Sequence, residues 1–385
     1  MPSTNGAFRS LLAAVFIAFF VAGCGSGTSG EAGPPSGEDS DPTPVESMAE
    51  TTAEEPTAEE TTESTAPVDI EAGVLVGGLE LPWDVAFLPD GDALVTERDT
   101  GRLLRVDEGG NTEEIQTIEV DETGEGGLLG LALSPDYEED EFIYAYYTTG
   151  EDNRIARFRL GEEPEAIFTG IPSAGIHNGG RIDFGPDGML YAGTGDANET
   201  GNSQDPDSPG GKILRLTPEG EVPDDNPVSG NPMYSMGHRN VQGLAWDEGG
   251  QLFAPEFGQN AFDEVNRIEA GENYGWPEVE GEGGEPEYMD PIATFTTSEA
   301  SPSGAAIMSG GAIPQWEGDF LMAALRGERL WRLDLDGSGE VAEREELLEG
   351  EYGRMRHVAQ APDGSAWILT SNGSDDQIIR VGPPE

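Results

Sequence analysis

The chain contains very few thiols, amines and imidazoles. It has one cysteine, Cys24, one lysine, Lys212, and three histidines among its 385 residues. A single cysteine excludes an internal disulfide, so the fold cannot rely on covalent crosslinks. The three histidines, His177, His238 and His357, are few enough that each can be weighed as a candidate for proton transfer.

Positive charge is also scarce. The 19 basic residues face 76 acidic residues, which gives a formal net charge of −57. Nucleic acids and anionic lipid head groups are therefore excluded as natural partners of the surface. A dense acidic surface is typical of proteins from salty habitats, because salt screens the repulsion between carboxylates. Any cluster of arginines in such a chain predicts a specific role.

The start of the chain has the pattern of an export signal. A short apolar run at positions 8–22 follows a weakly basic start and ends in Val-Ala-Gly-Cys at 21–24. The run is too short for a comfortable membrane span, so residues 1–23 are expected to be a lipoprotein signal peptide. Cys24 is then the lipidation site of an exported protein anchored at the outer face of the cell membrane. A free thiol near a cleavage site is the alternative.

Residues 24–67 are expected to form a disordered acidic tether. They are rich in Gly, Ser, Thr, Pro and Glu and contain no lysine or arginine. Such a segment cannot bury enough apolar surface to offset its ordering entropy. Residues 68–385 are long enough for one large all-β domain.

A short pattern recurs six times in this domain. Each copy is an apolar strand, a turn resembling Pro-Asp-Gly and usually a second apolar strand, and the copies start roughly 46 to 62 residues apart. The copies begin at Val85, Leu131, Ile182, Leu244, Ala306 and Val358. The recurrence predicts a six-bladed β-propeller of four-stranded antiparallel blades. A β-sandwich is the alternative, but it would not predict a six-fold repeat.

The third copy brings a histidine and a carboxylate together. His177 lies just before its first strand, and Asp196 follows the returning strand. An aspartate that accepts a hydrogen bond from one imidazole nitrogen orients the ring and leaves the other nitrogen as a base. A purely structural pair remains the alternative.

The fourth copy has cations at one end of a hairpin and an acidic loop at the other. The strands are expected at 244–246 and 252–254, with the segment from His238 to Gln242 before them and the loop from Phe257 to Glu264 after them. Both ends should meet at one edge of the sheet. Cations beside carboxylates and backbone carbonyls suggest a bound anion with a metal ion next to it.

Four arginines are expected on the same face of the propeller. They are Arg239, Arg326, Arg354 and Arg356. Residues 354 and 356 alternate by two, so in an extended strand their side chains point the same way. Guanidinium groups bind polycarboxylates or phosphates through paired hydrogen bonds. Four separate surface ion pairs are the alternative.

Several segments together resemble one known family. They are 81–91 (LPWDVAFLPDG), 125–132 (EGGLLGLA), 177–182 (HNGGRI), 237–244 (GHRNVQGL), 273–277 (NYGWP) and 353–356 (GRMR). In order and in every blade, from about residue 72 to the C-terminus, they resemble the glucose/sorbosone dehydrogenase family. More narrowly, they resemble the soluble aldose sugar dehydrogenases of this family, which depend on pyrroloquinoline quinone (PQQ).

The resemblance implies PQQ on the top face of the propeller with calcium beside it. It places His177 at the general base, Asp196 at the acid that orients it, and Arg239 at the quinone oxygen. The remaining implied cofactor contacts are Glu125, Asn240, Gln242, Arg326, Arg354 and Arg356. The implied calcium ligands are the carbonyls of Gly258 and Gln259, with Glu264 and the Tyr274 carbonyl at a second position. The second position has no clear later ligands within 280–284.

The implied function is oxidation of aldose sugars at the anomeric carbon to lactones, with an external electron acceptor and a monomeric or homodimeric enzyme. Ile176 stands where the glucose enzymes have aspartate, which leaves the preferred sugar open. Two alternatives remain at this stage. One is a calcium-dependent propeller hydrolase such as a lactonase, and the other is a non-catalytic surface propeller that binds sugar or protein.

Overall fold

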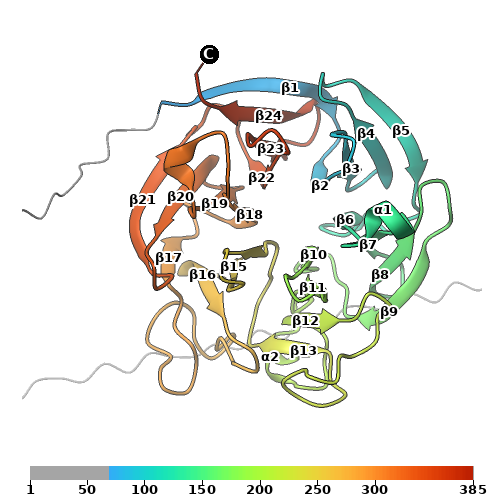
Figure 1. The fold of residues 1–385 in the computed structure, drawn as a ribbon. Coiled ribbons are helices and arrows are strands. Elements are labelled where there is room, and N and C mark those ends of the chain that lie inside the picture. The colour runs from blue at the N-terminus through green and yellow to red at the C-terminus, as the bar shows by residue number, and fades with distance from the viewer. Residues whose placement is uncertain (1–68, 385) are drawn as a thin grey trace, which may run out of the picture. The chain divides into compact units, whose positions relative to one another are not determined.

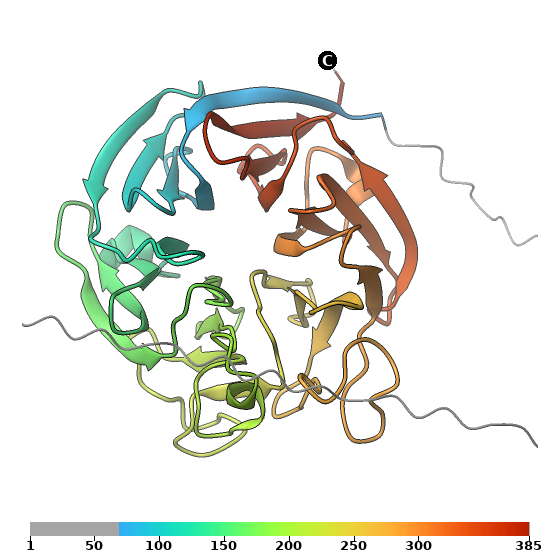
Figure 2. The same cartoon turned by 180° about the vertical axis from the view of Figure 1, so that it is seen from behind.

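A computed structural model describes residues 69–384 as six four-stranded antiparallel sheets around a central axis (Figure 1). Figure 2 shows the same ring of sheets from behind. The prediction of a six-bladed β-propeller is therefore confirmed. The expected signal peptide, the lipidation site at Cys24 and the tether up to residue 67 lie outside the described residues.

Each of the first five blades is built from four consecutive strands. Blade one contains β2 (Pro82–Phe87), β3 (Ala93–Glu97), β4 (Arg102–Val106) and β5 (Thr112–Thr117); blade two contains β6 (Leu128–Leu133), β7 (Ile143–Thr148), β8 (Asn153–Phe158) and β9 (Glu165–Ile171). Blade three contains β10 (Ile182–Phe184), β11 (Leu190–Gly193), β12 (Lys212–Leu216) and β13 (Met233–Met236); blade four contains β14 (Ala245–Trp246), β15 (Leu252–Glu256), β16 (Phe262–Ile268) and β17 (Ala293–Thr296). Blade five contains β18 (Pro302–Ile307), β19 (Phe320–Ala324), β20 (Arg329–Leu335) and β21 (Val341–Leu347).

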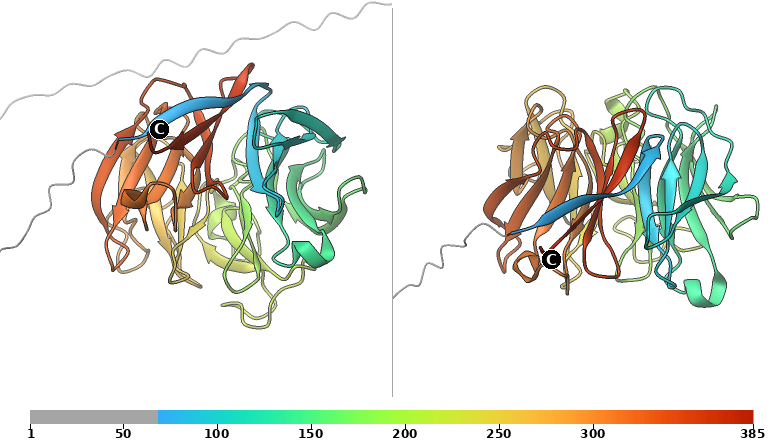
Figure 3. Two further views of the ribbon diagram at one scale, coloured as in Figure 1. Left: turned by 45° about the horizontal axis from the view of Figure 1, so that its top comes forward. Right: turned by 90° about the horizontal axis from the view of Figure 1, so that it is seen from above.

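The sixth blade closes the ring with strands from both ends of the domain. It contains β22 (Met355–Gln360), β23 (Ala366–Thr370), β24 (Asp376–Gly382) and, on its outside, β1 (Glu71–Leu79). Strand β1 runs antiparallel to β24, with Val74 opposite Ile379, and Figure 3 shows the two strands side by side. This pairing removes the open edges that an unclosed ring would leave.

The position of a strand within its blade determines its burial. The second strands β3, β7, β11, β15, β19 and β23 are buried along their whole length. The outer strands β5 and β21 are mostly exposed. The hydrophobic core lies between neighbouring blades; Leu321 of blade five, for example, packs in one cluster with Val358 and Ile368 of blade six. Both faces of the middle strands are therefore covered, which explains their continuous apolar runs.

The repeated turn explains why the pattern was visible in the sequence. Its glycine adopts a positive φ at Gly91 (94°), Gly188 (75°) and Gly364 (80°). L-residues with side chains rarely adopt this conformation, so glycine marks the turn. The helical segments in the described part are short: α1 (Tyr137–Asp140), α2 (Gly201–Gln204) and the 3-10 turn η1 (Pro314–Trp316). Among residues 69–384, no helix is long and apolar enough to span a membrane.

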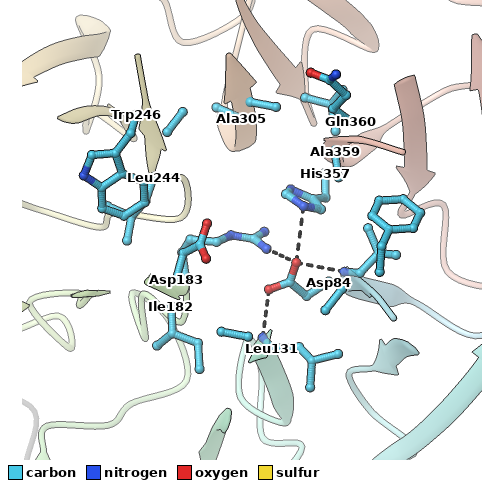
Figure 4. A pocket seen from close by; sticks show the side chains of 18 of the residues that line it. Asp84, Leu131, Ile182, Asp183, Leu244, Trp246, Ala305, His357, Ala359 and Gln360 are labelled. Atoms are coloured by element: carbon cyan, nitrogen blue, oxygen red, sulfur yellow. Dashed lines mark hydrogen bonds and ion pairs between the residues drawn. The ribbon is translucent and has the colours of Figure 1, made fainter. Parts of the chain in front are cut away.

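A buried carboxylate at the axis joins four of the blades. Asp84 accepts hydrogen bonds from the backbone amides of Val85 and Leu131, each at 2.8 Å. It also forms an ion pair with Arg181 and lies 3.2 Å from Nε2 of His357 (Figure 4). Burial raises the pKa of Asp84, and the charge of Arg181 opposes that shift. The contacts bring together blades one, two, three and six.

The same network continues to the other two blades. Nε of Arg181 donates to the carbonyl of Gln242 at 3.0 Å, and the guanidinium lies 4.3 Å from the ring of Trp83. The amide oxygen of Gln242 accepts from Nη1 of Arg356 at 2.8 Å and from Oγ of Ser303 at 3.1 Å. On the other side of Asp84, a cavity of about 430 Å³ is lined by the first strands of all six blades. The network therefore closes the centre of the ring.

Replacing Asp84 with alanine should destabilise the whole domain by about 3–5 kcal/mol, because it leaves the buried guanidinium of Arg181 without a counter-charge. The matched control is Asp90→Ala in the same blade, which removes an exposed ion pair with Arg105 and should have a much smaller effect. Urea unfolding at fixed pH and salt measures both. Equal losses in the two variants would contradict the role assigned to Asp84.

Candidate active site

His177 and Asp196 form a buried pair at one end of blade three. Nδ1 of His177 lies 2.7 Å from Oδ1 of Asp196, which confirms the predicted contact. Oδ2 of Asp196 accepts from the indole Nε1 of Trp276 at 2.9 Å. Burial tends to raise the pKa of Asp196, but the hydrogen bonds from His177 and Trp276 outweigh it and the net shift is downward. Asp196 is therefore ionised at neutral pH and holds a proton on Nδ1 of His177.

The backbone around His177 is held in an uncommon conformation. His177 has φ of 60°, in the left-handed region where non-glycine residues are rare. A Cβ on Gly195 would lie 1.9 Å from the carbonyl oxygen of His177, so only glycine fits beside it. Nε2 of His177 has no hydrogen-bond partner among residues 69–384. The ring therefore presents Nε2 to an incoming group.

Glu125 connects the histidine to a cavity on the same end of the propeller. Its Oε2 accepts a hydrogen bond from the backbone amide of His177 at 2.9 Å. The cavity has a volume of about 210 Å³. Its lining residues come from segments far apart in the sequence: Trp83, Arg98, Glu125, Gln242, Phe257, Ser301, Leu325, Arg326, Arg354 and Arg356. Four arginines and one glutamate make its wall positively charged in a strongly acidic protein.

The predicted gathering of arginines is confirmed for three of the four. Arg326, Arg354 and Arg356 line this cavity, and Arg239 lies beside it, with Nη1 3.4 Å from the carbonyl of Phe257. In the part of the chain that the structure describes, none of these four arginines forms an ion pair with a carboxylate. Most of the other arginines do, for example Arg102, Arg215 and Arg332. The alternative of four separate surface ion pairs is therefore wrong.

Two of these arginines have a buried donor atom that has no hydrogen-bond partner. Nε of Arg239 and Nε of Arg356 make no hydrogen bond in the structure. Burial lowers the pKa of Arg356 to about 9, and the nearby charges of Arg98 and Arg354 add to that effect. Burial also lowers the pKa of Arg239. A bound anion would supply the missing acceptors and offset the charge repulsion.

Asn240 and Gln242 take part in the framework around the cavity. Oδ1 of Asn240 accepts from the backbone amide of Gly179 at 2.9 Å, which fixes the segment after His177. Asn240 is not among the residues that line the cavity, whereas Gln242 is. His238 is fully buried, where its ring bonds Glu256 and Ser235 and stacks on Tyr274. It therefore supports the site from behind.

The loop after β15 presents free backbone carbonyls. Asp263 accepts from the amide of Gly258 at 2.9 Å, and Oε1 of Glu280 accepts from the four amides of residues 259–262 at 2.6 to 3.3 Å. No described residue donates to the carbonyl oxygens of Gly258 or Gln259. A Cβ on Gly258 would lie 1.7 Å from the carbonyl oxygen of Phe262, so the turn requires glycine there. Free carbonyls are suitable ligands for a hard cation such as calcium.

The second implied metal position is less complete. Burial and the neighbouring Glu256 raise the pKa of Glu264 to about 8, and its Oε1 accepts from the amide of Gly281. The carbonyl of Tyr274 has no donor among the described residues. Within residues 69–384, no group of three or more His, Cys, Asp or Glu side chains is arranged to hold a metal ion. The carbonyl pair of Gly258 and Gln259 is the better-supported position.

Three residues of the site had no assigned role in the sequence analysis. Trp276 donates to Asp196 across 80 positions of sequence, Arg98 adds a fourth cation to the cavity wall, and Trp83 forms part of that wall. Trp83 and Trp276 lie within segments that carried the family resemblance. No local pattern marks Arg98, because only the packing of blade one against its neighbours brings it to the cavity.

Known proteins resemble the chain along nearly the whole described domain. The sequence model of the family "Glucose / Sorbosone dehydrogenase" matches residues 79–380. Aldose sugar dehydrogenase YliI of Escherichia coli is 31% identical over 356 residues, covering 83% of this chain and 94% of that protein. Quinoprotein glucose dehydrogenase B of Acinetobacter calcoaceticus is 27% identical, with 79% and 86% covered.

A solved structure shows the same likeness in three dimensions. The PQQ-bound form of aldose sugar dehydrogenase from Streptomyces coelicolor superposes with a TM-score of 0.76 and is 50% identical, covering 82% of this chain and 99% of that one. The shared fold, the histidine–aspartate pair and the match over 79–380 lead to one conclusion. The chain belongs to the glucose/sorbosone dehydrogenase family.

Proposed function

We propose that the protein oxidises aldose sugars at the anomeric carbon to lactones, with PQQ as its bound oxidant. The observation that carries the proposal is a set of four arginines without carboxylate partners, Arg239, Arg326, Arg354 and Arg356, in and beside the cavity that Glu125 connects to His177. In a chain of net charge −57, acidic neighbours could pair with any arginine that was merely exposed. A site that keeps four guanidinium groups unpaired is suited to a polyanion.

The described residues fit this cofactor. PQQ carries three carboxylates, and the buried Nε atoms of Arg239 and Arg356 are donors without a hydrogen-bond acceptor. Arg326 and Arg354 are exposed at the cavity and can reach further carboxylate oxygens. The PQQ-bound relative from Streptomyces coelicolor supports the same assignment. The reaction of a hydrolase such as a lactonase would not require these arginines.

The proposed mechanism depends on which ring nitrogen of His177 carries the proton. With Nδ1–H held by Asp196, Nε2 accepts the proton of the anomeric hydroxyl of the sugar. Asp196 then stabilises the imidazolium that forms. When bound, PQQ supplies the two-electron oxidant that takes the hydride from the same carbon, so the hydroxyl carbon becomes the lactone carbonyl. Arg239, stacked 5.4 Å from the ring of Trp276, supplies positive charge beside the base.

We further propose that one calcium ion is held by the carbonyls of Gly258 and Gln259. Both carbonyls lack donors, and their amides are tied to carboxylates on the other side of the loop. Calcium would act there as a Lewis acid next to the cofactor. Glu280 would orient these ligands without touching the metal, since its Oε1 accepts the amides of the loop.

The proposed export of the protein rests on the first 24 residues. The apolar run that ends in Val-Ala-Gly-Cys supports cleavage before Cys24 and attachment of a lipid to its thiol. An acidic segment up to residue 67 would then separate the propeller from the membrane. Sugars and an external acceptor would reach the enzyme outside the cell.

His177→Ala should abolish turnover while preserving cofactor binding. Loss of the general base predicts a rate of dye reduction with glucose that is about 10²–10⁴-fold lower, with a Kd for PQQ close to that of the parent protein. Arg326→Ala should do the reverse and weaken PQQ binding. Titration of the calcium-loaded protein with PQQ, followed by dye reduction, measures both. Failure of the parent protein to bind PQQ at any salt concentration would contradict the proposal and favour the lactonase.

Glu280→Ala should weaken the binding of calcium although Glu280 is no ligand. Without its carboxylate the amides of residues 259–262 lose their acceptor, and the calcium concentration for half-maximal PQQ binding should rise about tenfold. Glu282→Ala, an exposed carboxylate of the same loop, is the control and should leave the calcium dependence unchanged. An equal shift in both variants would indicate a general charge effect instead.

Cys24→Ala should release the protein from the membrane. Without the thiol no lipid can be attached, so the full chain expressed in a bacterial host should move from the membrane fraction to the soluble or secreted fraction. Thr28→Ala is the control and should remain in the membrane fraction. Immunoblots of the fractions measure the change, and an unaltered distribution of Cys24→Ala would refute lipid anchoring at this residue.

A further inference from the structure

The single lysine of the chain is buried behind the active site. Lys212, at the start of β12, has no solvent exposure. Its Nζ donates to three backbone carbonyls, of Asn202 at 2.6 Å, Ser203 at 3.1 Å and Gly210 at 2.9 Å. In the described part of the chain it forms no ion pair with a carboxylate. All three hydrogens of the ammonium group are therefore directed at backbone oxygens of one loop.

The protonated form of Lys212 is the one that fits these contacts. Burial lowers its pKa to about 8, so the ammonium form still predominates at neutral pH. A neutral amine has only two hydrogens and would direct a lone pair at the third carbonyl. Burying a lysine is costly, and arranging three acceptors around it is a specific feature of this loop. The mechanism proposed above makes no use of this residue.

The loop held by Lys212 contacts the catalytic pair by two routes. Nδ2 of Asn202 donates to the carbonyl of Asp196 at 3.0 Å. Gln204, the last residue of α2, donates from Nε2 to the carbonyl of Trp276 at 2.7 Å. The indole of Trp276 in turn donates to the carboxylate of Asp196. Figure 1 shows α2 beside β12 and β13 of the same blade.

Gln204 also fixes the segment that carries Trp276. Its amide group exchanges hydrogen bonds with the side chain of Asn273, Nε2 to Oδ1 at 3.0 Å and Nδ2 to Oε1 at 2.8 Å. The adjacent Ser203 donates from Oγ to the carbonyl of His238 at 2.6 Å. The loop thus joins blade three to the segment 237–276 of blade four. Displacement of the loop would move the indole that sets the position of Asp196.

We propose that Lys212 is a positioning residue for the dehydrogenase reaction. Its ammonium group holds the loop of residues 202–210 in place. Gln204 in this loop holds the segment that carries Trp276. Trp276 in turn positions Asp196, and Asp196 positions His177. The proposal deepens the function proposed above and depends on it for its kinetic readout. A purely structural lysine would change global stability and leave the Trp276–Asp196 contact intact in the folded protein.

Lys212→Met tests the proposal, because methionine fills a similar volume without any donor. With PQQ saturating, kcat should fall about 10- to 100-fold, while the Kd for PQQ and the KM for the sugar change less than about threefold. A loss of kcat that only mirrors the fraction of unfolded protein, measured by circular dichroism, would overturn the assignment. Lys212→Arg keeps the charge and should recover part of the activity.

Gln204→Leu interrupts the same route at its next link and tests whether the two residues act together. If Lys212 works through Gln204, the double variant should lose about as much kcat as the worse single variant. Losses that multiply would mean independent effects and would refute the route. Gln204 is only half-buried, so its variant should fold even where Lys212→Met does not.

A measurement without turnover separates this proposal from the proposed function. The indole Nε1–H of Trp276, assigned by comparison with Trp276→Phe, should exchange with solvent faster in Lys212→Met and in Gln204→Leu than in the parent protein. Selective ¹⁵Nζ-lysine labelling gives a single signal, which at pH 7 should show a slowly exchanging ammonium group. If PQQ chemistry failed but the indole exchange changed, the route would stand. Unchanged exchange in both variants would overturn it.

Discussion

The buried carboxylate of Asp84 is the interaction on which the centre of the propeller depends. Six first strands converge at the axis, and the polar side chains buried among them, such as Asp84 and Arg181, must find partners within the protein. Asp84 meets the amide of Leu131, the guanidinium of Arg181 and the imidazole of His357, each from a different blade. Arg181 extends the contacts to Gln242. Because Gln242 also bonds Arg356, the network that closes the ring sets the position of an arginine in the cavity wall.

The cavity beside His177 is distinguished by arginines in its wall that form no ion pair with a carboxylate. At most surfaces of this chain, an arginine is paired with one or two acidic groups, as Arg215 and Arg329 are. At the cavity, four arginines lie near one another and the pKa of Arg356 is lowered. Gathering several like charges with only one carboxylate, Glu125, in the wall destabilises the ligand-free protein, and a bound anion would recover that free energy. In a chain of such acidic composition, the proposed binding of a polyanion would be confined to this site.

The features that could be predicted from the sequence are those that depend on local residue patterns. The turn glycines need a positive φ, so the blades were visible as a repeat, and His177 and Asp196 flank one hairpin, so their contact was predictable. The pairing of β1 with β24, the indole of Trp276 on Asp196 and the amides bound by Glu280 were not predicted. These contacts join residues far apart in the sequence, and long loops with no periodic pattern determine them.

The arrangement around Asp196 links the fold to the chemistry. A carboxylate this deeply buried would ordinarily have a raised pKa and would lose its charge. Here each oxygen accepts from a different blade, Oδ1 from His177 and Oδ2 from Trp276, and the net effect lowers the pKa. An ionised Asp196 fixes one tautomer of His177 and stabilises the imidazolium, so the base depends on a donor from another blade. The contact between blades three and four therefore contributes directly to the orientation of His177.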